Sequence, residues 1–396
     1  MALPKLLFYT HGLVDGGAER LWSCLASALK QRGYQVTFAV DFVASDNAAN
    51  LDPAIPLTVL GRNHALATAR LAKLLRAQRP DVALSAVGGS NLKLMTALGM
   101  ARVATRSILT FHGSVEPSSG LLAYLSYRGL PLLSRRAGRT IAVSEGLGLE
   151  LVSKWHADPA RTSVILNPVF FPKSAPVPTR TALAARPDVV LAAGRLSPEK
   201  DFTTLIRAFA LMKRPGAKLV ILGKGPDRAR LEAEVRRLGL EDTISMPGYC
   251  AEPWLHYQRA KCLVSSSTSE LFGNTIVEAL AYGLPVVATA CIGPDEIIKD
   301  PAHGKLVAIG DVVALAEAIG AALDNPGDPK ARRQRADQFS FDARVPAYEA
   351  LITDVLASQG SQRGPQQGRL SQACQNSALT LAVASEHHEL DILNHL

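Results

Sequence analysis

Apolar segments of two kinds alternate along the first part of this chain, and this alternation constrains the fold more than any other feature of the sequence. Short apolar runs bounded by turn residues are typical of buried strands, and longer segments with apolar residues three or four apart are typical of helices. Such segments follow one another at residues 6–9, 18–32, 36–40, 65–78, 82–86 and 108–111. Strands that alternate with helices predict βα units and a parallel sheet, so we expect an α/β fold.

The length of 396 residues exceeds what one hydrophobic core usually supports, so two domains are expected. A second alternating series begins at Val189, after a segment punctuated by prolines. We therefore expect a first domain over residues 1–170, a linker over 171–187 and a second domain over 188–340. A final helix-like segment covers 341–357, and the low-complexity residues 358–396 are expected to be disordered.

Composition excludes several classes of protein. No apolar run reaches the roughly 18 residues that a membrane-spanning helix needs, and the start of the chain has the pattern of a first strand, not a secretory signal. The five cysteines show no C-x-x-C or Cys/His spacing, which argues against a zinc site or a disulfide framework. We expect a cytoplasmic protein.

The net charge of +8 lies entirely within residues 1–170. Basic residues there are interleaved with aromatic and aliphatic ones: Arg128, Arg135, Arg136 and Arg139 with Tyr124, Tyr127, Leu130, Leu132 and Leu133. Such a stretch can lie on an anionic bilayer at the inner face of the plasma membrane. The alternative is a solvated helix face that borders the core. No nucleic-acid-binding motif accompanies the charge, so nucleic acid is not an expected partner.

Two carboxylates, Glu270 and Glu278, flank the start of a predicted helix. Glu270 follows the strand-like run 262–264 and a polar run, so it is expected at the carboxyl edge of a sheet. Asn274 is the expected helix cap, which places Glu278 about one turn into the helix. Free N–H groups at a helix start attract an anion such as a diphosphate, so a sugar nucleotide would fit there. Taken alone, the pair could equally be solvated helix-end charges.

Other residues that carry charge or allow close backbone approach also follow strands. Arg195 and Lys200 come after the strand that starts at Val189. Gly16 and Gly17 lie between the first strand and the first helix, where backbone N–H groups can approach a phosphate. His112 ends the run 108–111.

The ordered set of these motifs resembles the retaining glycosyltransferases of family 4, over about residues 3–356. The motifs are Gly-Gly-Ala-Glu-Arg at 16–20, Gly-Arg-Leu-Ser-Pro-Glu-Lys at 194–200, Gly-Lys-Gly-Pro at 223–226 and the Glu270 to Glu278 segment. The resemblance implies the GT-B fold, in which two Rossmann-like domains face each other across a cleft. It also implies that the helix over 341–357 crosses back to the first domain.

The resemblance also implies roles for the candidate residues. Arg195 and Lys200 would hold the donor diphosphate, Glu270 the transferred sugar and Glu278 the ribose hydroxyls. His112 would contact the donor sugar. Backbone N–H groups of Phe272, Gly273 and Asn274, together with the loop of Gly16 and Gly17, would approach the phosphates.

Two positions depart from the pattern of that family, and both lie on its sugar side. Leu271 stands where a small residue is common, and Gly-Pro-Asp-Glu at 293–296 is a variant of Gly-Gly-x-Pro-Glu. No Asp-x-Asp occurs in the chain, so the acidic pair that would hold a divalent metal on a donor diphosphate is absent. We expect transfer without a metal or another cofactor.

The expected function is transfer of a hexose or N-acetylhexosamine from a nucleotide-diphosphate sugar to a lipid-linked cell-surface glycan, with retention of configuration. The variant at 293–296 resembles that of bacterial family members that use UDP-linked amino sugars, so the resemblance favours UDP, and GDP-mannose stays open. Two alternatives remain, a sugar-nucleotide epimerase or hydrolase and a non-catalytic protein that binds sugar nucleotides.

Overall fold

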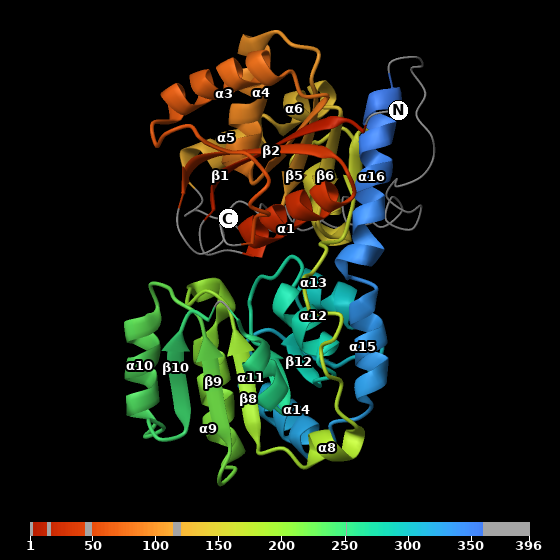
Figure 1. Ribbon diagram of the computed structural model, residues 1–396. Helices are drawn as coiled ribbons and strands as arrows, with labels where there is room; N and C mark the ends of the chain where they lie inside the picture. The colour runs from red at the N-terminus through yellow and green to blue at the C-terminus, as the bar shows by residue number, and fades with distance from the viewer. Residues whose placement is uncertain (1–2, 14–16, 44–49, 114–119, 251, 359–396) are drawn as a thin grey trace, which may run out of the picture. The chain divides into compact units, whose positions relative to one another are not determined.

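The computed structural model describes residues 3–13, 17–43, 50–113, 120–250 and 252–358. The chain divides into two compact units (Figure 1). The first comprises residues 1–166 together with 344–396, and the second comprises 167–343. The segment 171–187, expected as a linker, therefore belongs to the second unit and contains a short helix, α8 (Arg180–Ala184).

The first unit is built on a seven-stranded, wholly parallel sheet in the order β3-β2-β1-β4-β5-β6-β7. Its strands are β1 (Lys5–Leu13), β2 (Gln35–Val43), β3 (Leu57–Val59), β4 (Val82–Ala86), β5 (Arg106–Phe111), β6 (Arg139–Ala142) and β7 (Thr162–Val164). All five residues of β4 are buried, as expected for a central parallel strand that is covered on both faces.

Helices connect these strands, as the alternation predicts. They are α1 (Gly17–Gln31), α3 (His64–Gln78), α4 (Gly88–Ala101), α5 (Leu121–Arg128), α6 (Leu130–Arg136) and α7 (Glu145–Ser153). The last helix, α16 (Phe341–Ala357), belongs to this unit from Arg344 onward. Arg139 of β6 donates to Asp354 of α16 at 2.7 Å, and the close approach of Val355 to Gly138 leaves no room for a larger residue at that glycine.

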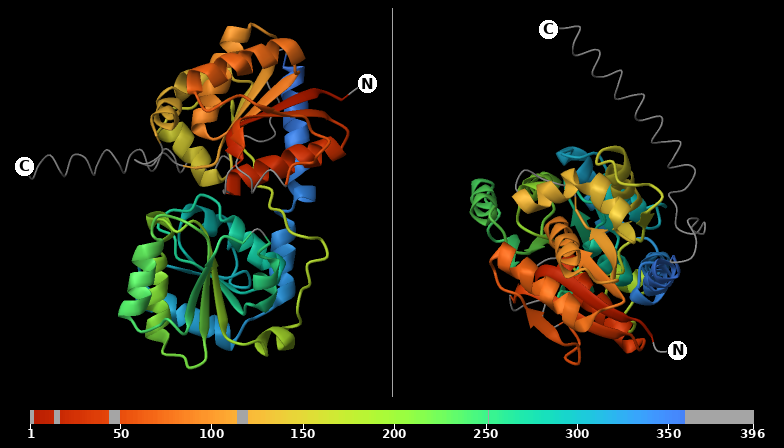
Figure 2. Two further views of the ribbon diagram at one scale, coloured as in Figure 1. Left: turned by 60° about the vertical axis from the view of Figure 1, so that its left-hand side comes forward. Right: turned by 90° about the horizontal axis from the view of Figure 1, so that it is seen from above.

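The second unit has a six-stranded parallel sheet in the order β10-β9-β8-β11-β12-β13, with helices on both sides of it (Figure 2). Its strands are β8 (Val189–Ala193), β9 (Lys218–Leu222), β10 (Ile244–Gly248), β11 (Cys262–Ser265), β12 (Val286–Thr289) and β13 (Lys305–Val307). Besides α8, its helices are the 3-10 turn η1 (Pro198–Lys200), α9 (Phe202–Met212), α10 (Arg228–Arg237), α11 (Trp254–Arg259), α12 (Asn274–Ala281), α13 (Ile292–Ile297), α14 (Val312–Asp324) and α15 (Pro329–Asp337).

The core of the second unit lies where α9 and α14 pack against the sheet. Apolar side chains of both helices, such as Leu205 and Ile319, are fully buried with strand residues Val190 and Val287. At about 25 cal/mol per Å² of apolar surface, burial of each such side chain contributes about 1.5–3 kcal/mol to folding. This packing fixes the positions of the strand ends and therefore of the loops that follow them.

The strand order reverses once in each sheet, between β1 and β4 in the first unit and between β8 and β11 in the second. In open α/β sheets, the crevice outside the carboxyl ends of the strands at such a reversal is the usual place for a ligand. The loops after β8 and β11 carry the motifs at 194–200 and 270–278. The second unit therefore brings two motifs 70 residues apart to one place.

In the described part of the chain, no helix has both the length and the apolar character needed to cross a membrane.

Candidate functional site

Lys200 and Glu270 meet at the strand reversal of the second unit. The ammonium group of Lys200 donates to Oε2 of Glu270, and the two side chains keep 22% and 18% of their surface exposed. The hydroxyl of Ser266 donates to the carbonyl oxygen of Lys200 at 2.9 Å, and the N–H of Thr268 donates to the carbonyl oxygen of Glu199 at 2.8 Å. These bonds tie the β8–α9 loop to the β11–α12 loop and set the position of the ion pair.

Arg195 lies five residues before Lys200 in the same loop, but its charge is not paired in the same way. The residue is exposed, and its guanidinium group has no hydrogen bond or ion pair among the described residues. The charge of Lys200 is balanced by Glu270, whereas the charge of Arg195 is not. Arg195 is therefore a forked donor available to an anion in this loop.

The start of α12 presents backbone donors next to Glu270. Gly273 is the N-terminal cap residue and has φ of 106°, a conformation that favours glycine. The N–H groups of Phe272 and Gly273 have no acceptor among the described residues. The prediction that Asn274 caps this helix is wrong: Asn274 is its first residue, and its Oδ1 accepts from Asn167 at 3.5 Å. The glycine took the cap position because only a residue without Cβ adopts this left-handed turn at low cost.

The variant segment at 293–296 supports this loop. The N–H of Gly293 donates to the carbonyl oxygen of Glu270 at 2.8 Å. A Cβ at position 293 would lie 2.3 Å from the backbone nitrogen of Phe272, so only glycine allows the approach. Gly293 therefore positions the loop that carries Glu270 and the free N–H groups.

A second backbone contact of this kind joins the loops after β8 and β9. Gly223 has φ of 144°, and a Cβ there would lie 1.8 Å from the carbonyl oxygen of Gly194. The N–H of Leu196 donates to the carbonyl oxygen of Lys224 at 2.9 Å. Gly223 thus allows the loop of Arg195 and Lys200 to rest directly on its neighbour.

Glu278 is 7% exposed, and its Oε2 accepts from the hydroxyl of Tyr257 at 2.6 Å. Tyr257 is fully buried on α11 and stacks on Tyr282, with ring centroids 5.7 Å apart and an interplanar angle of 15°. Sequence reasoning did not find Tyr257, because no spacing relates position 257 to position 278 before the chain is folded. The tyrosine orients one oxygen of the carboxylate for which the family resemblance implies a ribose contact.

In the first unit, His112 follows β5, as expected. Both ring nitrogens are buried and have no partner among the described residues, and the ring packs edge-on against Trp22 at 6.0 Å. Burial lowers the pKa of His112 to about 4, so the ring is neutral near pH 7. A neutral imidazole offers one donor and one acceptor, which suits a hydroxyl group. Gly17 is exposed at the start of α1, and Gly16 lies outside the described residues.

A cluster that sequence reasoning missed lies in the same unit. The carboxylate of Asp41, fully buried on β2, accepts hydrogen bonds from Tyr9, His11 and Lys93. His11 lies near the end of the first strand, but no spacing in the sequence relates it to Asp41 or Lys93 before the chain is folded.

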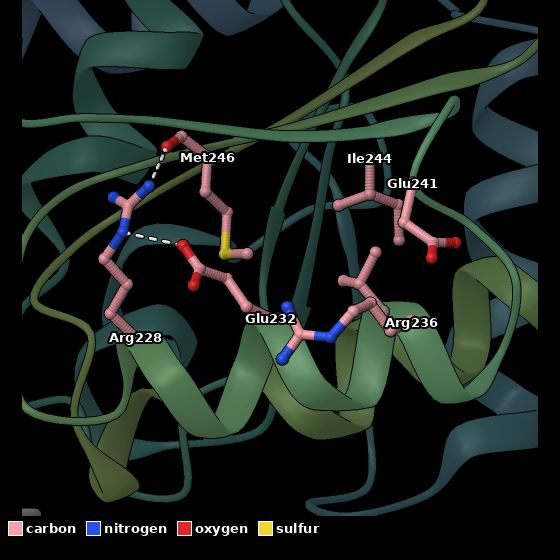
Figure 3. Close-up of a pocket in the computed structure, with 7 residues that line it drawn as sticks. Arg228, Glu232, Arg236, Glu241, Ile244 and Met246 are labelled. Carbon is pink, nitrogen blue, oxygen red and sulfur yellow. Dashed lines mark hydrogen bonds and ion pairs between the residues drawn. The ribbon is translucent and has the colours of Figure 1, made fainter.

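A shallow hollow lies elsewhere, over α10 and the edge strand β10 (Figure 3). Its volume is about 210 Å³. Arg228 there pairs with Glu232 at 2.8 Å and donates to the carbonyl oxygen of Met246 at 2.9 Å. These groups satisfy one another and lie away from the strand reversal, so the hollow is not the candidate site.

Models of known protein families match both units of the chain. The family described as Glycosyltransferase Family 4 matches residues 15–170, and Glycosyl transferases group 1 matches residues 178–339. The lipopolysaccharide core biosynthesis glycosyltransferase LpsE of Rhizobium meliloti is 33% identical over 172 residues, which are 41% of this chain and 49% of that protein.

A Campylobacter jejuni N-acetylgalactosamine-N,N'-diacetylbacillosaminyl-diphospho-undecaprenol 4-alpha-N-acetylgalactosaminyltransferase is 27% identical over 225 residues, covering 56% of this chain and 61% of the relative. The chain thus spans about half the length of these curated relatives. The crystal structure of Anabaena HepE with UDP-glucose superimposes with a TM-score of 0.75 at 21% identity, covering 90% of this chain and all of that one.

The two parallel sheets, each covered by helices, and the structural match to HepE confirm the GT-B fold. The fold and the family matches together define a protein of the glycosyltransferase type. The chain belongs to family 4 of the glycosyltransferases, its second half being of the group 1 type.

Proposed function

We propose that this protein transfers a hexose or N-acetylhexosamine from a nucleotide-diphosphate sugar, preferably a UDP-sugar, to a lipid-linked glycan during synthesis of a cell-surface polysaccharide. The observation that carries the proposal is the arrangement at the β8/β11 reversal. There, Arg195 shares the loop after β8 with Lys200, and the N–H groups of Phe272 and Gly273 directly follow Glu270. Neither the Arg195 guanidinium nor these N–H groups have a partner among the described residues.

These groups suit the chemistry of the donor. When the bond between the anomeric carbon and the diphosphate breaks, negative charge grows on the leaving phosphate oxygen. Fixed cations and N–H groups stabilise that charge more strongly in the transition state than in the ground state. Arg195 and the N–H groups of Phe272 and Gly273 would supply this stabilisation, with Lys200 turning from Glu270 toward the phosphate.

Retention of configuration follows from a front-face displacement through an oxocarbenium-like state. The acceptor oxygen bonds to the anomeric carbon on the face that the diphosphate leaves, and the acceptor proton passes to the departing phosphate oxygen. Glu270 would bind the hydroxyls of the transferred sugar, and Glu278, oriented by Tyr257, those of the ribose. His112, neutral near pH 7, would contact the sugar.

The relatives support the chemical class of the substrates. LpsE is a glycosyltransferase of lipopolysaccharide core biosynthesis, and the Campylobacter relative is named for an undecaprenol-linked substrate. HepE was solved with UDP-glucose bound. A UDP-sugar and a lipid-linked glycan are therefore the first donor and acceptor to test, with GDP-mannose next.

The proposal is tested by Glu270→Ala and Arg195→Ala with radiolabelled UDP-sugars and lipid-linked acceptors. Each substitution removes an interaction with the donor, so we expect turnover to fall by about 10²-fold or more, a loss of about 3 kcal/mol. Glu241→Ala and Arg236→Ala, which change exposed residues near the edge strand β10, should leave turnover unchanged. Near-native turnover in both site variants would remove the assignment.

Donor incubated without acceptor separates the alternatives. An epimerase or hydrolase would convert the donor alone, and a non-catalytic binding protein would bind the nucleotide without any turnover. The transferase requires the acceptor for its main reaction.

Metal independence is also a proposal, resting on the missing Asp-x-Asp and on the cations at 195 and 200. Turnover should persist in excess chelator, because protein cations and helix N–H groups neutralise the leaving diphosphate. Loss of turnover in chelator with recovery on addition of magnesium would contradict it.

A peripheral position on the cytoplasmic face of the membrane completes the proposal. Exposed apolar side chains on α5 and α6, such as Leu121 and Leu132, lie near exposed Arg128, Arg135 and Arg136 in the sequence. The fourth basic residue of the stretch, Arg139, instead lies on β6 and pairs with Asp354.

A further inference from the structure

The buried cluster around Asp41 occupies the carboxyl half of the sheet in the first unit. In the register of β1 and β2, Thr10 pairs with Val40 and Gly12 with Phe42, so His11 lies opposite Asp41. His64, at the start of α3, and Lys93, on α4, complete the cluster from the helices. The ring centroids of His11 and His64 are 5.4 Å apart.

The contacts of the cluster favour one tautomer of each neutral histidine ring. Nδ1 of His11 lies 2.7 Å from Oδ2 of Asp41 and 3.3 Å from the ammonium of Lys93. The shorter contact is to an ionised carboxylate, which only accepts, so a neutral His11 carries its proton on Nδ1 and leaves Nε2 as an acceptor. Nδ1 of His64 lies 3.5 Å from the ammonium of Lys93, which only donates. Neutral His64 therefore accepts at Nδ1 and carries its proton on Nε2.

Charges within the cluster balance. Lys93 is 5% exposed in its side chain and pairs with Asp41, which is fully buried. Burial would raise the pKa of Asp41, but hydrogen bonds from His11 and Lys93 hold it below its ordinary value. Burial and the charge of Lys93 lower the pKa of His64, in keeping with a neutral ring. The buried cation of the cluster, Lys93, is therefore compensated by Asp41 and is not available to a phosphate or carboxylate.

A metal ion is also disfavoured, although His11, Asp41 and His64 present ligand atoms within 4.8 Å of one another. The ammonium of Lys93 contacts all three of these ligand atoms, so it already holds the place that a cation would take. A divalent ion would have to displace this buried ammonium at high electrostatic cost.

We propose that His11 and His64 form a binding site for a hydroxyl group of a carbohydrate, with Nε2 of His11 accepting from the hydroxyl and Nε2–H of His64 donating to it. The side chain of His11 is 44% exposed and His64 is exposed, so both rings are accessible. One acceptor beside one donor matches a hydroxyl group, which needs both. Asp41 and Lys93 are positioning residues that fix the two tautomers.

The identity of this carbohydrate as the glycan acceptor rests on the proposed function. The residues proposed to bind the nucleotide-sugar donor lie in the second unit, except His112. None of them belongs to the Asp41 cluster. Hydrogen bonding here orients the ligand, and no proton transfer to His11 is required.

The test uses the full chain labelled with ¹⁵N-histidine. Long-range ¹H–¹⁵N NMR spectra at pH 7.5 should show His11 protonated at Nδ1 and His64 at Nε2. Addition of methyl glycosides of glucose, galactose and N-acetylglucosamine at tens of millimolar should shift both sets of signals saturably. His11→Ala and His64→Ala should each weaken glycoside binding about tenfold, the usual effect of one lost hydrogen bond of about 1.4 kcal/mol.

The control is His156→Asn, which changes an exposed histidine of the same unit and should leave the titration unchanged. His64→Ala keeps the Asp41–Lys93 pair, so it serves if His11→Ala does not fold. An Nε2–H tautomer at His11, an absence of shifts in both rings, or micromolar Zn²⁺ binding that abolishes their signals would each overturn the inference. Thermal stabilisation by UDP, measured in parallel, tests the donor site. If UDP does not stabilise the protein, the proposed transferase function is contradicted, whatever the glycoside titration shows.

Discussion

His112 shows how a single residue changes character on burial. Its ring nitrogens are shielded and unpaired among the described residues, and burial holds its pKa at about 4 against an ordinary value of 6.5. The charged ring is costly inside the fold, so folding keeps the imidazole neutral. A contact with a sugar hydroxyl would give these nitrogens a hydrogen-bond partner that the described residues do not supply.

This residue predicts a pH dependence of stability. Between about pH 6.5 and pH 4 the unfolded chain binds a proton at position 112 that the folded chain does not, so stability should fall as the pH falls through that window. His112→Gln removes the titrating group and should flatten the fall, as measured by urea unfolding at pH 7 and pH 5. His156→Asn is the matched control, and equal slopes in His112→Gln and the wild type would contradict the prediction.

At the scale of elements, glycines permit loops to touch where side chains would keep them apart. Gly293 at the start of α13 approaches the backbone of Phe272 before α12, and Gly223 after β9 approaches that of Gly194 after β8. These two contacts clamp the two loops that carry Arg195 and Glu270. The loop geometry therefore depends on positions that hold no chemistry themselves.

Gly293→Ala should therefore impair nucleotide binding. The added Cβ would lie 2.3 Å from the nitrogen of Phe272, so the loop of Glu270 must move, at a cost of about 1–3 kcal/mol in stability. We expect thermal stabilisation by UDP to be lost or strongly reduced. Gly320→Ala, inside α14 with nothing within 4 Å of the new Cβ, should raise stability by about 0.5–1 kcal/mol and leave UDP binding intact. Equal UDP binding in both variants would contradict this account.

At the scale of the whole molecule, the charge of the chain is strongly asymmetric. The excess of +8 resides in residues 1–170, whereas the rest of the chain is balanced. Such a field draws one part of the molecule toward anionic surfaces, and each basic residue close to an anionic bilayer contributes about 1 kcal/mol.

Membrane binding should therefore depend on α6. We expect the full chain to co-sediment with vesicles that contain phosphatidylglycerol, and the double variant Arg135→Glu/Arg136→Glu to lose most of that binding. The control, Lys73→Glu/Arg102→Glu, makes the same charge change at exposed residues of the same unit. Equal loss in both variants would show a general charge effect, and undiminished binding in the Arg135/Arg136 variant would remove the membrane proposal.

The sequence by itself determined the alternation of strands and helices, and with it the parallel sheets. It also placed Arg195, Lys200 and Glu270 after strands, since hydrophobic period and turn residues are local properties of the chain. The cap of α12 was missed by one residue, because a left-handed glycine competes with asparagine at that turn.

Only the tertiary structure decided which of these groups are paired. Lys200 meets Glu270 across 70 residues, Tyr257 orients Glu278, and Lys93 meets Asp41 across 52 residues. The strand order and the packing of helices on the sheets bring such residues together, and neither is encoded in local spacing. That Arg195 has no partner among the described residues, and that His11 and His64 both meet Lys93, therefore became visible only in the folded chain.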